Sequence, residues 1–143
     1  MKNYIIRIIL LIVFTGSVAC VATSAGQSTG SAKIRKQNSP FACNVEALTP
    51  AERRRHFDEL GPMLRSLKKD VRELKNGYEF QFTSDAKTFQ LVSEWAIQES
   101  ACCPFFQIEM RLESEGGPLW LKLTGRNGTK DFIQADAGDW IKK

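Results

Sequence analysis

Hydrophobic and polar residues alternate along three stretches of the chain, 78–83, 105–113 and 119–124. Alternation of this kind is typical of β-strands that bury one face. An Asn-Gly pair at 76–77 precedes the first stretch and favours a two-residue hairpin turn, which requires a partner strand near 69–75. The glycine-rich segment between the other two stretches predicts a second hairpin. We therefore expect four strands.

A first helix is predicted to begin at Pro50 and to end near residue 67. Thr49 and Glu52 have the spacing of a capping box, and proline is favoured at the first helical position. Gly61-Pro62 predicts a kink or a break inside this helix. The apolar spacing also fits one longer helix, but the strand that the first hairpin requires favours the shorter one. The positions with this spacing are Phe57, Leu60, Leu64, Leu67, Val71 and Leu74.

A second helix is predicted to begin after a cap at Ser84 or Asp85 and to reach Ala101. A short C-terminal helix is expected near 129–136. Beyond it, two apolar residues near 140 are expected to pack late or to fray. The residues expected to face the core are Phe89, Val92, Trp95 and Ala96 in the second helix and Phe132 and Ile133 in the C-terminal one; the two late residues are Trp140 and Ile141.

Together these elements predict an α+β fold. Its four-stranded, largely antiparallel sheet consists of two hairpins and is packed on one side by the two main helices and the short C-terminal helix. Residues 41–143 are enough for one domain with a modest single core. We expect its large aromatic residues to form the core and the wall of a pocket; these are Trp95, Phe105, Phe106 and Trp120.

The first 22 residues resemble an export signal, because an apolar run follows Lys2 and Arg7 and small residues come next. We interpret residues 1–22 as a signal peptide or as a lipoprotein signal with Cys20 as the lipidated residue; an uncleaved anchor is the third alternative. Residues 23–40 are predicted to be a disordered tether. Each alternative predicts an exported protein, periplasmic or membrane-anchored, that contacts the membrane only through the signal or the lipid.

The charge pattern argues against a nucleic-acid partner. The whole chain has a formal net charge of +4, and two of its basic residues lie in the expected signal. The run Arg53 to Arg55 is flanked by Glu52, Asp58 and Glu59, which is typical of a solvated helix face. No phosphate-cradling glycine loop is present either, so no organic cofactor is expected.

The chemistry of the chain is concentrated where the second helix ends, at two adjacent thiols, Cys102 and Cys103. Pro104 has no backbone donor and disfavours helical geometry in the residue before it, so Cys102 should lie in the last helical turn. A helix C-terminus opposes the formation of a thiolate, and Glu99 one turn earlier opposes it again. A metal ion would reverse this balance, because a coordinating cation deprotonates its thiol ligands.

Apart from Cys20, the chain has three cysteines whose role must be explained: Cys43, Cys102 and Cys103. One alternative is that Cys43 bridges one of the adjacent pair, as a disulfide that staples an interaction domain. A second is that all three sulfurs hold a soft ion such as Hg(II), Cu(I), Zn(II) or trivalent arsenic. A third is a redox pair that cycles through a disulfide between the two adjacent cysteines or through Cys43. We assign no catalytic residue and expect binding of a metal or metalloid ion rather than an enzymatic activity.

Two further side chains are candidates for this site. Glu99 would tune the sulfurs as an additional metal ligand or proton acceptor, although a carboxylate at a helix end usually faces solvent. His56 is the only histidine, and because it lies in a charged helix we expect it at the surface. The predicted metal-site residues are therefore Cys102, Cys103, Cys43 and Glu99.

Several segments resemble a family of small bacterial proteins that carry an E-x-x-C-C-P-F motif. The resemblance covers about residues 41 to 134, and the motif at 99–105 is its most specific part. It implies an association with mercury or other heavy-metal resistance, without a reaction. The other matching segments are Asn76 to Phe80, Gly117 to Gly125, and Asp131-Phe132.

Overall fold

The computed structural model describes residues 41–142, which form the predicted α+β fold. The expected signal at 1–22 and the expected tether at 23–40 lie outside the described residues. Along the chain the elements are the 3₁₀ turn η1 (Val45–Ala47), α1 (Pro50–Arg54), the π-helical segment η2 (Arg55–Leu60), α2 (Gly61–Leu67), β1 (Asp70–Leu74), β2 (Gly77–Phe82), α3 (Ala86–Cys102), β3 (Phe106–Leu112), β4 (Leu119–Gly125), α4 (Thr129–Asp136) and α5 (Gly138–Ile141).

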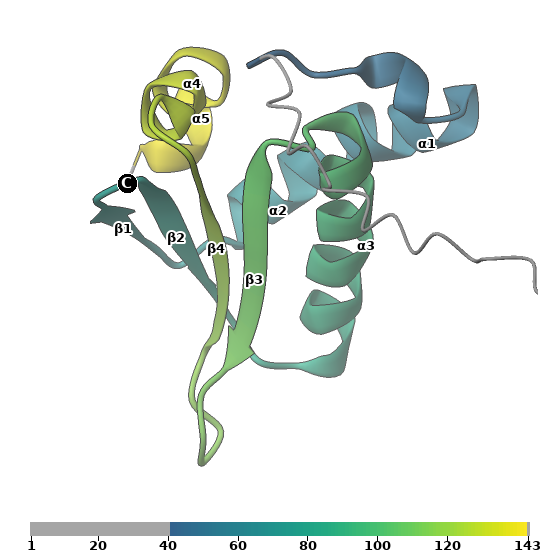
Figure 1. Cartoon of the computed structure of the whole chain (residues 1–143). Helices are drawn as coiled ribbons and strands as arrows, with labels where there is room; N and C mark the ends of the chain where they lie inside the picture. Colours follow the sequence, from purple (N-terminus) through teal and green to yellow (C-terminus); the bar gives the residue numbers. More distant parts are fainter. Residues whose placement is uncertain (1–40, 143) are drawn as a thin grey trace, which may run out of the picture. The chain divides into compact units, whose positions relative to one another are not determined.

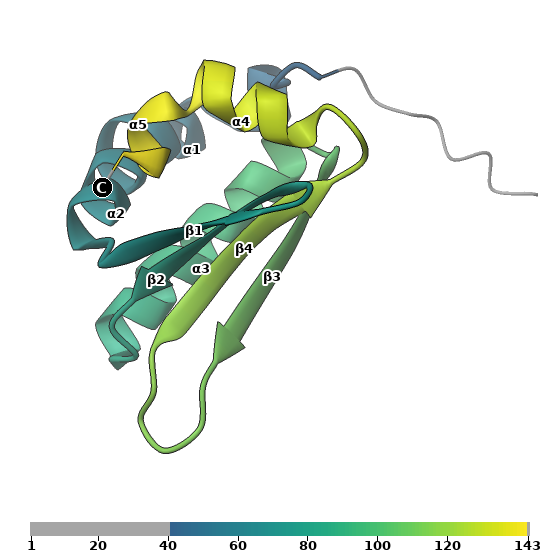
Figure 2. The same cartoon turned by 90° about the vertical axis from the view of Figure 1, so that its left-hand side faces the viewer.

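The four strands form one antiparallel sheet in the order β1-β2-β4-β3 (Figures 1 and 2). Both predicted hairpins are confirmed: β1 pairs with β2, and β3 pairs with β4. The two central strands, β2 and β4, pair with each other, and Phe80 lies opposite Leu121. This central pairing brings the two hairpins together into a single layer.

The first helix has the predicted bounds, and a π-helical turn lies next to Gly61-Pro62, where the sequence predicted an irregularity. Thr49 and Glu52 make both hydrogen bonds of the capping box, and the helical backbone continues through α1, η2 and α2 to Leu67. The Gly61 N–H donates to the carbonyl of His56, five residues back, which is the wider π-helical turn. This turn precedes Pro62, whose missing N–H cannot continue the α-helical pattern. Helical backbone ends before Lys68, so the alternative of one helix reaching residue 74 is wrong.

The core lies between the sheet and the helices. α3 places Val92, Trp95 and Ala96 against the inward side chains of β2 and β4, while α4 and α5 add Ile133 and Trp140. Trp140, expected to pack late or fray, is therefore part of the core. Burial of these apolar side chains is the main favourable term for the fold.

Two aromatic residues at helical apolar positions are exposed. Phe89 keeps 39% of its surface accessible and Phe57 keeps 43%. On α3, Thr88 and Val92 define the buried stripe one turn apart, and Phe89 lies at the edge of that stripe. The expectation that Phe89 faces the core was therefore wrong.

Trp120 lies on the sheet face that points away from the core. Its neighbours Leu119 and Leu121 point into the core, so alternation along β4 sends the indole to the other side. The ring is only 1% exposed because the Arg72 guanidinium covers it at 3.8 Å from the ring centre. Trp120 is thus buried as expected, but under an arginine on the polar face and not in a pocket wall.

Candidate functional site

The sulfur site forms where α3 ends and the segment before η1 passes beside it. Cys102 is the last residue of α3 and Cys103 is its C-cap, as the proline at 104 predicts. The N–H of Asn44 donates to the carbonyl of Cys102 at 2.8 Å, which fixes Cys43 beside the helix end. Phe41 anchors the same segment, with its ring centre 5.2 Å from that of Phe105.

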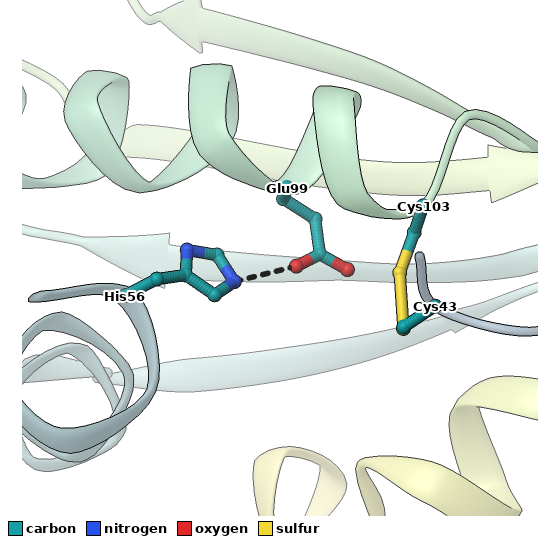
Figure 3. Close-up of a disulfide and its surroundings, with 4 residues drawn as sticks. All are labelled: Cys43, His56, Glu99 and Cys103. Carbon is teal, nitrogen blue, oxygen red and sulfur yellow. Dashed lines mark hydrogen bonds and ion pairs between the residues drawn. A yellow bond between two sulfur atoms is a disulfide. The ribbon is translucent and has the colours of Figure 1, made fainter. Parts of the chain in front are cut away.

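The three cysteines converge at this point. Their sulfur atoms all lie within 4.8 Å of one another. Cys43 and Cys103 are paired as a disulfide, with their Cα atoms 4.8 Å apart (Figure 3). Cys102 keeps a free thiol, and neither Cys102 nor Cys103 has any exposed surface, whereas Cys43 is half-buried. The predicted meeting of an early cysteine with the adjacent pair is confirmed.

The free thiol of Cys102 is held in its protonated form. Burial away from water, and to a smaller extent the nearby carboxylates of Glu99 and Asp136, together raise its pKa to about 11. A protonated thiol is a poor nucleophile at neutral pH. The contribution of Glu99 fits the expectation that this carboxylate opposes a thiolate, while the larger contribution comes from burial.

The expected positions of His56 and Glu99 are wrong. His56 is 2% exposed and Glu99 is 8% exposed, and the imidazole Nε2 lies 2.9 Å from a carboxylate oxygen of Glu99. The imidazole also stacks on Trp95, with ring centres 5.4 Å apart. The carboxylate at the helix end therefore faces a buried partner instead of solvent.

A helical spacing in the sequence could have identified His56 as buried. His56 lies four residues before Leu60, which is itself four residues before Leu64, and both leucines are fully buried. Residues at this spacing share one helix face. The polar character of the flanking arginines and acids concealed this relationship.

Glu99 connects the histidine to the sulfurs. In Figure 3 its carboxylate lies between His56 and the Cys43–Cys103 disulfide, with one oxygen directed to the imidazole and the other on the disulfide side. The second imidazole nitrogen, Nδ1, is buried and has no hydrogen-bond partner within residues 41–142. Placing the ring proton on Nε2, where it is donated to the carboxylate, avoids a buried unpaired donor.

A pocket of about 440 Å³ opens beside this site. Of the three cysteines only Cys43 lines it, and His56 and Glu99 contribute to its wall. Trp95 and Trp140 form an aromatic part of the wall. Asp136 and Asp139 lie at the exposed part of the pocket. The pocket therefore reaches the disulfide from one side only, through Cys43.

All four predicted site residues thus lie in one place. Trp95 lines a pocket wall as expected, whereas the buried position of His56 and the presence of Asp136 were not predicted. Three clustered sulfurs with a carboxylate can either form a disulfide or hold a soft cation. Within residues 41–142, none of the helices has the length and apolar character needed to span a membrane. Comparisons of the chain with protein-family models, curated proteins and solved structures found no match.

Proposed function

We propose that this chain binds one soft metal or metalloid ion through the thiolates of Cys43, Cys102 and Cys103, after reduction of the Cys43–Cys103 disulfide. The observation that carries this proposal is the convergence of three sulfur atoms within 4.8 Å. Hg(II), Cu(I), Zn(II) and trivalent arsenic are the ions for which such a set is suited, because thiolates select soft and borderline ions.

The spacing of the sulfurs supports a shared ion. A zinc ion holds thiolates at about 2.3 Å, so two sulfurs on one such ion are separated by at most ~4.6 Å. The observed limit of 4.8 Å requires only a small movement of the side chains once the disulfide is open. Cys102 then contributes the third sulfur from the end of α3.

The local charges also support an ion. The thiol of Cys102 has a raised pKa, and a coordinating cation is the means by which a buried thiol loses its proton at neutral pH. Glu99 supplies negative charge beside the sulfurs. In this proposal Glu99 tunes the site, either as an oxygen ligand or as the acceptor of a thiol proton, and His56 holds its carboxylate in place.

The N-terminal composition and the E-x-x-C-C-P-F resemblance extend the proposal to the setting of the protein. An apolar run after two basic residues supports export, which would place the site outside the cytoplasm. In that oxidising setting the disulfide is the resting form and the reduced form is the one that binds the ion. The resemblance supports a role in resistance to mercury or another heavy metal.

The test is a titration of the reduced full chain with Hg(II) in the presence of an excess of a competing monothiol. A Cys20→Ser background leaves only the three described cysteines, and a phosphine opens the disulfide. We expect about one Hg(II) retained per chain, because a chelate of several sulfurs holds the ion against a monothiol. The double variant Cys102→Ser/Cys103→Ser should lose the ion while remaining folded.

A matched control keeps the number of thiols constant. In Cys102→Ser/Ser100→Cys, one thiol moves to an exposed position of α3, so three thiols remain but only two converge. This variant should hold Hg(II) more weakly than the parent chain. Retention of one Hg(II) by the double variant Cys102→Ser/Cys103→Ser would contradict the proposal.

A second candidate function is thiol–disulfide exchange. The observation in its favour is the Cys43–Cys103 pair itself, next to a free thiol and open to a pocket at Cys43. This function predicts a reversible equilibrium with glutathione that passes through a mixed disulfide. Failure to trap any mixed disulfide would remove this candidate.

A further inference from the structure

We infer that the pocket beside the disulfide binds a small thiol that carries an ammonium group, and that this thiol reduces the Cys43–Cys103 disulfide by attacking Cys43. The inference rests on the proposed function, because it names the reductant that frees the sulfurs for the ion. It goes further by assigning a substrate class to a pocket that the ion itself does not fill.

Access to the disulfide selects the sulfur that is attacked. Cys43 is half-buried and lines the pocket, whereas Cys103 is fully buried and does not line it. Exchange requires a thiolate to reach a disulfide sulfur, so access decides between the two. A reductant arriving through the pocket therefore meets Cys43 first.

The size and wall of the pocket fit an organic molecule. Its volume of about 440 Å³ lies within the range of small-molecule sites, roughly 300 to 1,000 Å³, and far exceeds the needs of one ion. Trp95 and Trp140 have ring centres 5.0 Å apart and form an aromatic wall. His56 also lines the pocket and contributes a polar ring to its wall.

The charges around the pocket favour a cationic group. Three carboxylates line it, from Glu99, Asp136 and Asp139, against one guanidinium from Arg65. Glu99 is bonded to His56, and Asp139 is bonded to a lysine at 2.6 Å. Asp136 is exposed and has no hydrogen bond or ion pair with a described residue. Its carboxylate, beside aromatic faces that attract cations, is the partner we assign to the ammonium group.

The reaction balances with two molecules of the small thiol. The first loses its proton and attacks the Sγ of Cys43; a mixed disulfide forms, the bond to Cys103 breaks, and the Cys103 sulfur leaves as a thiolate that takes up a proton. The second small thiol attacks the small-molecule sulfur of the mixed disulfide. It releases Cys43 as a thiol and leaves a symmetrical small disulfide. Two small thiols are oxidised and one protein disulfide is reduced.

The experiment compares three thiols of similar size and different charge: cysteamine, 2-mercaptoethanol and 3-mercaptopropionate. Each reacts with the oxidised full chain in the Cys20→Ser background. Each rate is divided by the rate of the same thiol with a neutral small disulfide, which removes differences in intrinsic reactivity. Acid quenching followed by peptide mass spectrometry locates the mixed disulfide.

We expect the adduct on Cys43 and a normalised rate about three- to tenfold higher for cysteamine than for 3-mercaptopropionate. Asp136→Asn should remove most of this preference. The matched control Asp58→Asn changes an exposed carboxylate outside the pocket and should retain it. Unfolding would expose the buried disulfide and raise the rate with the neutral thiol 2-mercaptoethanol, so an unchanged rate with that thiol shows that Asp136→Asn has lost the charge and not the fold.

An adduct on Cys103, or normalised rates that do not depend on charge or on Asp136, would overturn the inference. Its failure is distinguishable from failure of the proposed function, because the ion titration uses a phosphine and needs no small thiol. A chain that binds Hg(II) but reacts alike with all three thiols overturns the pocket assignment alone. A chain with the Cys43 adduct that retains no Hg(II) supports the pocket assignment and overturns the ion site.

Discussion

The thiol of Cys102 links stability to pH at the scale of one residue. Its pKa is about 11 in the folded chain against an ordinary value of 9.0, mainly because of burial. The folded state therefore holds this proton more tightly than the unfolded state. The stabilising contribution is complete below about pH 9 and is lost as pH rises through about 11.

We predict that the free energy of unfolding falls between pH 9 and pH 11, and that it falls less steeply in Cys102→Ala. The comparison with Cys102→Ala isolates this thiol from the tyrosines and lysines that titrate in the same range. Urea unfolding at several pH values measures the effect. Parallel pH profiles for the parent chain and the variant would show that Cys102 has no raised pKa.

The His56–Glu99 pair gives a second prediction. Removal of either partner leaves a buried polar group unpaired, so His56→Ala and Glu99→Ala should each lower the free energy of unfolding by about 2 to 4 kcal/mol. The double variant should lose less than the sum, with a coupling of about 1 to 3 kcal/mol. Chemical denaturation of the four chains measures it.

Phe57 is the control for this pair, because it neighbours His56 and is 43% exposed. Phe57→Ala should show little coupling to Glu99→Ala. Additive losses for His56 and Glu99 would mean that the buried contact does not hold the two elements together.

At the scale of residues, the sequence predicted the sulfurs well and their neighbours poorly. A proline after the adjacent cysteines fixes where the helix ends, so Cys102 and Cys103 could be placed from local geometry alone. The burial of His56 depends on α3 packing against the first helix, and the charges beside it in sequence suggested the opposite. Local patterns do not report on such long-range contacts.

At the scale of elements, the pairing of β2 with β4 requires a very close approach of the two backbones at Gly77. A Cβ at Gly77 would lie 1.9 Å from the carbonyl oxygen of Leu123. We predict that Gly77→Ala costs about 2 kcal/mol or more, because the two strands would have to separate at their paired ends. Thermal or urea unfolding measures the loss.

Gly138 is a suitable control, since a Cβ there has no neighbour within 4 Å and its backbone is not left-handed. Gly138→Ala should change the free energy of unfolding by less than about 0.5 kcal/mol. Equal effects of the two substitutions would contradict the assigned closeness of β2 and β4.

The sequence specified most elements because several local signals agreed at each one. The capping box, the Asn-Gly turn and the strand alternation all proved correct within a few residues. The π-helical turn at Arg55–Leu60 was not foreseen, because its wider hydrogen bond depends on how Pro62 is accommodated. Strand order also lay beyond local patterns, since the pairing of β2 with β4 joins distant hairpins.

At the scale of the whole molecule, the Cys43–Cys103 disulfide ties the N-terminal segment to the centre of the fold. The two cysteines are 60 residues apart in sequence. Closing a loop of this length stabilises a domain by about 4 kcal/mol through the entropy of the unfolded chain. This is also what the alternative of a stapled interaction domain requires.

We therefore predict that reduction with a phosphine lowers the urea midpoint of the chain, and that Hg(II) restores part of the loss by binding only the folded state. Cys43→Ser should have the same urea midpoint with and without the phosphine, since it has no Cys43–Cys103 bridge to lose. If Hg(II) does not raise the urea midpoint of the reduced chain, the role of these cysteines is to form a structural disulfide.

The central claim is that Cys43, Cys102 and Cys103 share one ion. X-ray absorption spectroscopy of the reduced chain with Cys20→Ser, loaded with one equivalent of Hg(II), counts the sulfur neighbours of the ion directly. Our account predicts three sulfurs in this chain and two in Cys102→Ser. Two sulfurs in both proteins would contradict it, because Cys102 would then lie beside the ion without binding it.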